Sequence, residues 1–154
     1  MTTAPDSYDL NRFVEAQEAS YAQALAELRA GRKRAHWIWY VLPQIHGLGM
    51  SGMSVRYAIT SLAEARAYLA HPLLGARLRE CVAAINGHRD GGDGPDAEEI
   101  LGGIDAQKFR SCLTLFIEAG GEEGLFGEAL RRYYGGEADQ ATLEVLARDN
   151  GRGA

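Results

Sequence analysis

Most of the side chains that could carry chemistry gather in one stretch, residues 31–52. Its sequence, GRKRAHWIWYVLPQIHGLGMSG, holds three consecutive basic residues, both tryptophans and two of the four histidines. Guanidinium and ammonium groups bind phosphates and carboxylates, and a tryptophan ring near the surface can stack on a flat ligand. We therefore expect a ligand site, if the protein has one, to include this stretch and to take an anionic ligand.

His36 is the candidate for acid–base chemistry in this stretch. It stands between the basic residues and the aromatic cluster, where neighbouring positive charge favours the neutral imidazole that a general base needs. A histidine bonded to a backbone carbonyl would give the same sequence, so both interpretations stay open. The chain has no Ser-His-Asp order, nucleophile elbow or paired-carboxylate motif, and whether it is an enzyme stays open too.

A second group of polar residues follows at Asp105, Lys108, Arg110 and Ser111. Asp105 and Lys108 are three positions apart at an expected helix start, where a helix cap and a surface ion pair explain both without a ligand. Arg110 follows Phe109 on a helix with a strong core face. Its guanidinium therefore either extends to solvent or binds an acidic group.

These two groups are expected to meet, because one helix alone cannot surround a ligand. In such a site Arg34 supplies fixed charge, His36 a titratable group, and Lys108 or Arg110 a cation from the opposite wall. The alternative is purely structural: Asp105 pairs with Arg32 or Arg34 and locks the two segments together. The candidate binding residues are Arg32, Arg34, His36, Trp37, Trp39, Gln44, Asp105, Lys108, Arg110 and Ser111.

Two classes of function fit these residues. The first is a helical domain that binds a small anionic or phosphate-bearing ligand at the Arg32–Gly52 segment. The alternative is a protein-interaction module that uses exposed tryptophan and arginine side chains of the same segment. A ligand site should be a concave pocket with converging polar groups, whereas a partner surface should be flatter and apolar with a charged rim.

Three other patterns give no metal site and no cofactor. Gly47, Gly49 and Gly52 spell GxGxxG, but no βαβ unit surrounds them, so turning the chain is the simpler role. The aspartates of residues 90–96 lack the acidic twelfth position of a calcium loop, where Leu101 stands. The two cysteines have no metal-binding or redox spacing and are expected to be buried thiols.

Composition limits the remaining possibilities. A chain of 154 residues with 46% hydrophobic residues fits one globular domain, and its longest apolar run is too short to span a membrane. The net charge of −5 disfavours general nucleic-acid binding. The first residues, MTTAPDSYDLNR, lack a signal-peptide pattern, so we expect a cytoplasmic location.

Apolar residues recur at helical spacing along nearly the whole chain. The run from Trp37 to Leu42 could be a buried strand or a buried helical turn, and it is assigned to helix because no other segment alternates as a partner strand would. The sequence thus predicts an all-α fold of about eight short helices without a sheet. The expected domain is residues 1–154, with an ordered core at about 9–148 and a mobile acidic, glycine-rich loop at 90–96.

Three strings, GRKRAHWIWYVLPQIHGLG, HPLLGARLREC and DAQKFRSCLTLF, resemble the bacterial family known as domain of unknown function 1810, sometimes labelled calpastatin-like. The resemblance covers about residues 10–146 and implies a compact all-helical domain without an assigned activity. The calpastatin label finds no support, because a calpain-inhibitor segment is disordered whereas these helices are strongly patterned. Cys112 departs from the family pattern, which commonly has a second serine there. The shared positions are His36, Trp37, Trp39, Pro43, Gln44, His71, Pro72, Asp105, Lys108 and Ser111.

Overall fold

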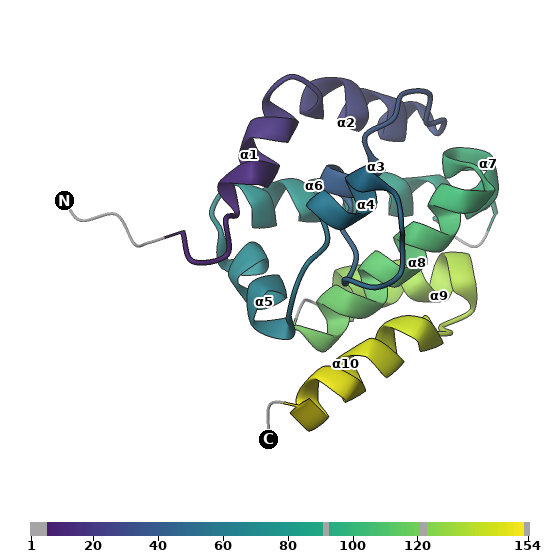
Figure 1. Ribbon diagram of the computed structural model, residues 1–154. Coiled ribbons are helices and arrows are strands. Elements are labelled where there is room, and N and C mark those ends of the chain that lie inside the picture. Colours follow the sequence, from purple (N-terminus) through teal and green to yellow (C-terminus); the bar gives the residue numbers. More distant parts are fainter. Residues whose placement is uncertain (1–5, 91–92, 121–122, 153–154) are drawn as a thin grey trace.

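The computed structural model describes residues 6–90, 93–120 and 123–152, and over these ranges the chain forms ten α-helices and no sheet (Figure 1). The all-α prediction is confirmed; the count exceeds eight because α3, α4 and α7 are helices of only four or five residues. The longest of the helices described, α8, has 16 residues, and none is long and apolar enough to cross a membrane. The helices are α1 (Asn11–Glu18), α2 (Tyr21–Ala30), α3 (Ile38–Val41), α4 (Gly52–Arg56), α5 (Leu62–Ala70), α6 (Leu74–Asn86), α7 (Ala97–Leu101), α8 (Gly103–Glu118), α9 (Glu128–Tyr134) and α10 (Gln140–Arg152), with a 3-10 turn at Gly87–Arg89 and a π-helical turn at Glu123–Gly127.

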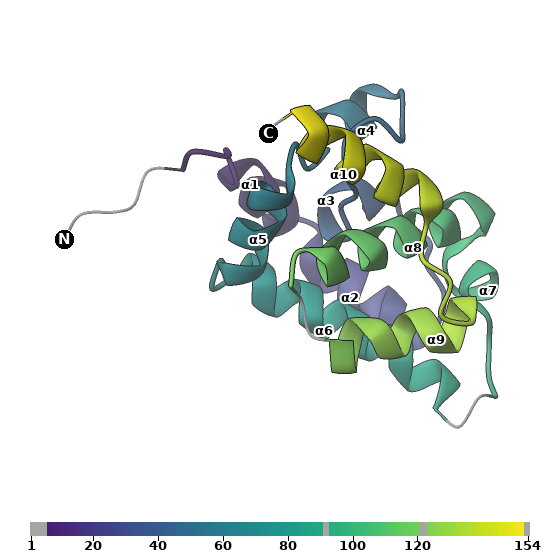
Figure 2. The same ribbon diagram turned by 90° about the horizontal axis from the view of Figure 1, so that it is seen from below.

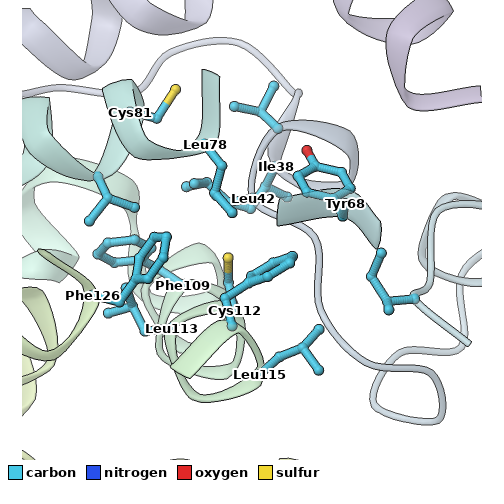
Figure 3. Packing of buried hydrophobic residues seen from close by; sticks show 14 of the residues in the cluster. Ile38, Leu42, Tyr68, Leu78, Cys81, Phe109, Cys112, Leu113, Leu115 and Phe126 are labelled. Carbon is cyan, nitrogen blue, oxygen red and sulfur yellow. The ribbon is translucent and has the colours of Figure 1, made fainter. Parts of the chain in front are cut away.

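Helix α8 runs through the middle of the molecule and contacts both α9 and α10. Figure 1 shows α3 and α4 above α8, and Figure 2 shows α10 on the same side of α8 as α4, with α9 on the opposite side. Its predicted core stripe of Phe109, Cys112, Leu113 and Phe116 is fully buried. Figure 3 shows the α8 side chains facing Leu78 and Cys81 of α6, and Phe126. Burial raises the pKa of the Cys81 thiol to about 12 and raises that of the Cys112 thiol well above its ordinary value, as expected of inert core cysteines.

The aromatic run forms α3, a single buried helical turn, and the chain then crosses α8 as an extended loop, residues 42–51 (Figure 1). The loop is anchored to the segment after α4 by two backbone hydrogen bonds: the Ile59 N–H donates to Gln44, and the His46 N–H donates to Ile59, each at 2.9 Å. This pairing makes one isolated bridge between Ile45 and Ile59 and holds Gln44 over α8.

A buried carboxylate, that of Glu27 on α2, organises the irregular segment before α3. Its Oε1 accepts hydrogen bonds from the backbone N–H groups of Arg34 (2.8 Å) and Ala35 (3.1 Å) and from Nε1 of Trp37 (2.9 Å). Its Oε2 accepts a bond from Gln23. Burial alone would raise the pKa of Glu27, but these bonds to the charged form outweigh it and lower the pKa to about 2.

A second buried acid, Glu64, fixes the chain between α4 and α5. It accepts a charged hydrogen bond of 2.8 Å from Arg12 and bonds from the backbone N–H and hydroxyl of Thr60. The Arg12 guanidinium also donates to the carbonyl of Ala58, which ties α1 to this segment. The segment that pairs with the 42–51 loop is therefore held rigidly in place.

The predicted mobile loop at 90–96 lies partly outside the described residues, since residues 91–92 are not described. Its end is ordered by a reciprocal capping box at the start of α7. The Asp96 side chain accepts from the Glu99 N–H at 2.8 Å, and the Glu99 side chain accepts from the Asp96 N–H at 3.1 Å. The spacing of the two acids, three positions apart before an apolar run, is typical of such a cap.

Replacement of Glu27 by Gln tests its role in folding. Since the ordinary pKa is near 4.5 and the folded value is about 2, the carboxylate stabilises the fold fully above about pH 5, and this contribution is lost as the pH falls toward 2. We expect Glu27→Gln to lower the free energy of unfolding by about 2 to 3 kcal/mol at pH 7 and by progressively less between pH 5 and pH 3. Urea denaturation at each pH measures the difference from wild type.

The control variant for this experiment is Glu144→Gln, because Glu144 is exposed and makes no side-chain hydrogen bond within the described residues. It should change the free energy of unfolding by less than about 0.5 kcal/mol. A Glu27→Gln deficit that does not vary with pH would contradict the assignment.

Candidate functional site

An ion pair between Lys33 and Asp105 joins the basic segment to the start of α8. The Lys33 Nζ lies 2.7 Å from Asp105 Oδ2, and the lysine side chain is only 6% exposed. Nζ also donates to the carbonyl of Ala35 at 2.6 Å and sits 5.0 Å from the ring centroid of Trp37. The backbone N–H of Lys33 donates to the carbonyl of Ile100. The two segments expected to meet therefore do lie together.

The prediction that Asp105 pairs with Arg32 or Arg34 is wrong. Both arginines and His36 are exposed, and none of the three side chains has a hydrogen bond or ion pair with a described residue. Exposure alternates along residues 32–36, so the odd-numbered Lys33 points inward while its neighbours point outward. Glu27 enforces this arrangement by binding the N–H groups of Arg34 and Ala35.

Both tryptophans belong to this segment, but they are placed differently. Trp37 is 1% exposed, and its indole N–H is bonded to Glu27, so it is a core residue. Trp39 is partly buried and packs toward α8. Of the candidates before Pro43, only Trp39 therefore lines a hollow that adjoins the concave surface beside α8.

That concave surface, which we call the α8 groove, lies between the 42–51 loop, α8 and the start of α10. Its volume is about 470 Å³, within the range of small-molecule sites. A narrow slot of about 10 Å³, enough for one water-sized group, shares two of its walls, Gln44 and Lys108. We call it the Trp39 slot. Residues lining the groove include Gln44, Leu48, Ile104, Lys108, Ser111 and Asp139; the slot adds Trp39, Ser54 and Tyr57.

Two hydrogen-bond donors on the slot walls have no acceptor. The Trp39 indole nitrogen is buried and finds no partner among the described residues. Lys108 Nζ lies 5.3 Å from the Trp39 ring centroid, and no described carboxylate is within ion-pair distance of it. A buried N–H without an acceptor costs about 1 to 3 kcal/mol, so this corner favours a group that accepts hydrogen bonds and carries negative charge.

The other end of the groove is occupied by a satisfied capping network around Asp139. Its Oδ2 accepts hydrogen bonds from the Ser111 hydroxyl (2.9 Å) and from the N–H and hydroxyl of Thr142. The Asp139 side chain thereby caps α10. The Asp139 N–H in turn donates to Thr114. The Ser111 hydroxyl therefore positions α10 against α8.

Arg110 is directed away from the groove. Its Nε donates to the carbonyl of Glu137 at 2.8 Å, and its Nη2 donates to the carbonyl of Ala138 at 3.2 Å. The guanidinium also lies 5.9 Å from the ring centroid of Tyr134. Arg110 thus holds the connection between α9 and α10, and its contacts explain it without a ligand.

The glycines of the 42–51 loop have steric roles. A Cβ on Gly49 would lie 2.6 Å from the Ser54 side chain, so only glycine allows the loop to approach α4 this closely. Gly47 has a φ of +86°, and the following helix is capped by the Ser51 side chain. A bond of 2.9 Å between His46 and Asp149 ties the loop to α10. The simpler interpretation of GxGxxG, as turning the chain, fits this geometry.

Several groove residues are not among those predicted from the sequence, and Asp139 and Ile104 matter most. Asp139 had a signal, because an aspartate three positions before a threonine at a helix start is a typical cap. No sequence pattern marks Ile104 as a groove residue, because an isoleucine near a helix start is usually buried and this one is 77% exposed. No group of three or more metal-binding side chains occurs within the described ranges.

The comparisons with known proteins define the family. The family model described as "Protein of unknown function (DUF1810)" matches residues 7–146, and the chain belongs to that family. It is also similar to a solved structure, the conserved hypothetical protein Rv1873 from Mycobacterium tuberculosis, at 48% sequence identity and a TM-score of 0.86. That match covers 92% of this chain and 99% of the other. No curated protein matches the chain.

The Lys33–Asp105 pair can be tested by removing one charge. Lys33→Met leaves the largely buried Asp105 carboxylate without its cation, and we expect the free energy of unfolding to fall by about 2 to 4 kcal/mol. The matched control is Arg34→Met, which removes the same charge from an exposed side chain and should cost less than about 0.5 kcal/mol. Urea denaturation at pH 7 measures both, and equal losses would show that Lys33 does not lock the segments.

Proposed function

We propose that this protein binds a small molecule with a carboxylate or phosphate group, and that this group enters the α8 groove at Lys108. The observation that carries the proposal is the pair of unsatisfied donors, the Lys108 ammonium and the Trp39 indole N–H, on the walls of one slot. An anionic oxygen at Lys108 would accept a charge-assisted hydrogen bond, which is the strong kind, and it would accept from the buried Trp39 N–H as well once the narrow slot opens.

The position of Lys108 over the indole ring supports this use of its charge. A cation–π contact at a partly exposed site contributes only about 0.5 to 1 kcal/mol and leaves the ammonium hydrogens free for an anion. The Gln44 side chain lies on the same walls and can donate through its amide. Three candidates from the sequence analysis, Trp39, Gln44 and Lys108, therefore remain in the proposed site, while Ser111 supports it through Asp139.

The proposal is limited to binding. The Ser111 hydroxyl donates to Asp139, and both thiols are buried in the core, so none of these groups is a ready nucleophile at the groove. The expected roles of Arg34 and His36 at the groove mouth are dropped from the proposal, because neither residue lines the groove.

The alternative function, a protein-interaction surface, has weaker support in its original form. It requires exposed tryptophans, but Trp37 is buried and Trp39 is partly buried. Arg32 and Arg34 do remain exposed, yet isolated surface arginines without an aromatic anchor rarely dominate an interface. We therefore favour the small-molecule site.

Binding can be followed through the two indole N–H signals in a ¹H–¹⁵N correlation spectrum of the full chain, which has two tryptophans. Titration with sodium acetate and with inorganic phosphate should move the Trp39 signal saturably, since its N–H gains an acceptor. The chemical shift of the Trp37 signal should not change, because its N–H already donates to Glu27. Trp39→Phe assigns the two signals.

Lys108→Met should weaken anion binding by about 10- to 100-fold, the effect of losing a hydrogen bond to a charged group. Arg34→Met removes the same charge outside the groove and should leave the dissociation constant within about twofold. The proposal fails if neither anion moves the Trp39 signal saturably, or if both variants bind equally.

A further inference from the structure

Three large apolar side chains near the 42–51 loop are strongly exposed: Met50 (95%), Ile104 (77%) and Val55 (65%). Ile104 lines the α8 groove, and Met50 directly follows Gly49, which also lines it. Val55 lines a neighbouring hollow on the other side of Gly49. A lone exposed apolar residue needs no explanation, but Ile104 lies on the wall of a groove that also holds an unpaired cation.

The position of these groups along α8 gives the groove a direction. Ile104, Lys108 and Ser111 are spaced four and three residues apart, so they share one helix face. Ser111 contacts Asp139, which places that carboxylate about one turn beyond Lys108. The order along the wall is therefore apolar, cationic and then acidic.

This order restricts how an anion can lie. The Asp139 carboxylate repels a negative group, although its Oδ2 is partly compensated by three donors. The charged end of a ligand therefore stays at Lys108 and Trp39, and its remaining atoms extend along the groove beside Ile104 and Leu48. An inorganic anion would leave the Ile104 side chain in water, whereas a hydrocarbon group would cover it.

We infer that the ligand is an amphipathic anion, in which the carboxylate or phosphate carries an aliphatic or aromatic body that covers Ile104 and Leu48. This inference rests on the proposed function, because it takes Lys108 as the position of the charged group. The groove volume of about 470 Å³ accommodates such a body. The chemistry separates the two contributions: Lys108 sets the need for a charge, and Ile104 sets the preference for an apolar chain.

The test is a series of straight-chain carboxylates, from acetate through butyrate and hexanoate to octanoate, titrated into the full chain and followed by the Trp39 indole signal. The dissociation constant should fall by about three- to fourfold for each added methylene that the groove covers. The fall should stop once further methylenes extend beyond the apolar wall into water. Hexyl phosphate and 1-hexanol test the charged end at constant chain length. Hexyl phosphate should bind comparably to hexanoate, and hexanol at least tenfold more weakly.

Two matched variants locate the chain. Ile104→Ser removes the exposed apolar side chain on the groove wall and should flatten the chain-length dependence. Val55→Ser makes a comparable change in the neighbouring hollow and should leave the dependence steep. Both residues are exposed, so both variants should fold, which their melting temperatures verify.

The outcomes separate the two claims. Carboxylates that all bind with one affinity, hexanol that binds as well as hexanoate, or a chain-length dependence lost in Val55→Ser and kept in Ile104→Ser would each overturn the amphipathic ligand. Failure of the whole series to bind, or equal binding by Lys108→Met, would instead overturn the proposed function.

Discussion

The buried carboxylate of Glu27 is the interaction on which the rest of the site depends. Residues 32–37 form no helix, so their backbone N–H groups lack regular partners, and Glu27 binds those of Arg34 and Ala35 directly. The same oxygen binds the Trp37 indole and so fixes where α3 begins. Because α3 is a single turn, its start determines where Trp39 lies. One acid on α2 thus sets the wall of a groove that it does not touch.

The groove also shows why its parts must come from distant regions of the sequence. The 42–51 loop crosses α8 (Figure 1) and is held in its first half by the backbone bridge to Ile59 and by the bond between His46 and Asp149. The Lys33–Asp105 ion pair holds the start of α8 against the segment before α3, from which the loop continues. Three anchors of different chemistry therefore keep a solvent-filled surface concave, where hydrophobic packing alone would close it.

The sequence predicted the helical fold because it follows from local rules, whereas the meeting of the two polar segments was expected only from the argument that one helix cannot surround a ligand. Helical spacing places Phe109 and Phe116 in the core, and a capping box marks the start of α7. The sequence could not predict that Lys33 is the residue that pairs with Asp105. This depends on the buried Glu27, and a glutamate on an amphipathic helix is normally exposed to solvent. The direction of the Arg110 side chain could not be predicted either. Its partners are the backbone carbonyls of residues 137–138, and every residue type carries a carbonyl, so the sequence does not mark them.

The contrast between the two tryptophans is the strongest argument that the α8 groove has a purpose beyond folding. They lie two positions apart, and the fold supplies Trp37 with a carboxylate, which satisfies its N–H completely. The Trp39 N–H has no acceptor in the part of the chain that the structure describes, although the Gln44 amide lines the same slot. Leaving such a donor unpaired costs about 1 to 3 kcal/mol, which an acceptor supplied by a ligand would offset. Among the described residues, neither the Trp39 N–H nor the Lys108 ammonium has an acceptor, and the proposed anionic ligand would supply one to both from outside the chain.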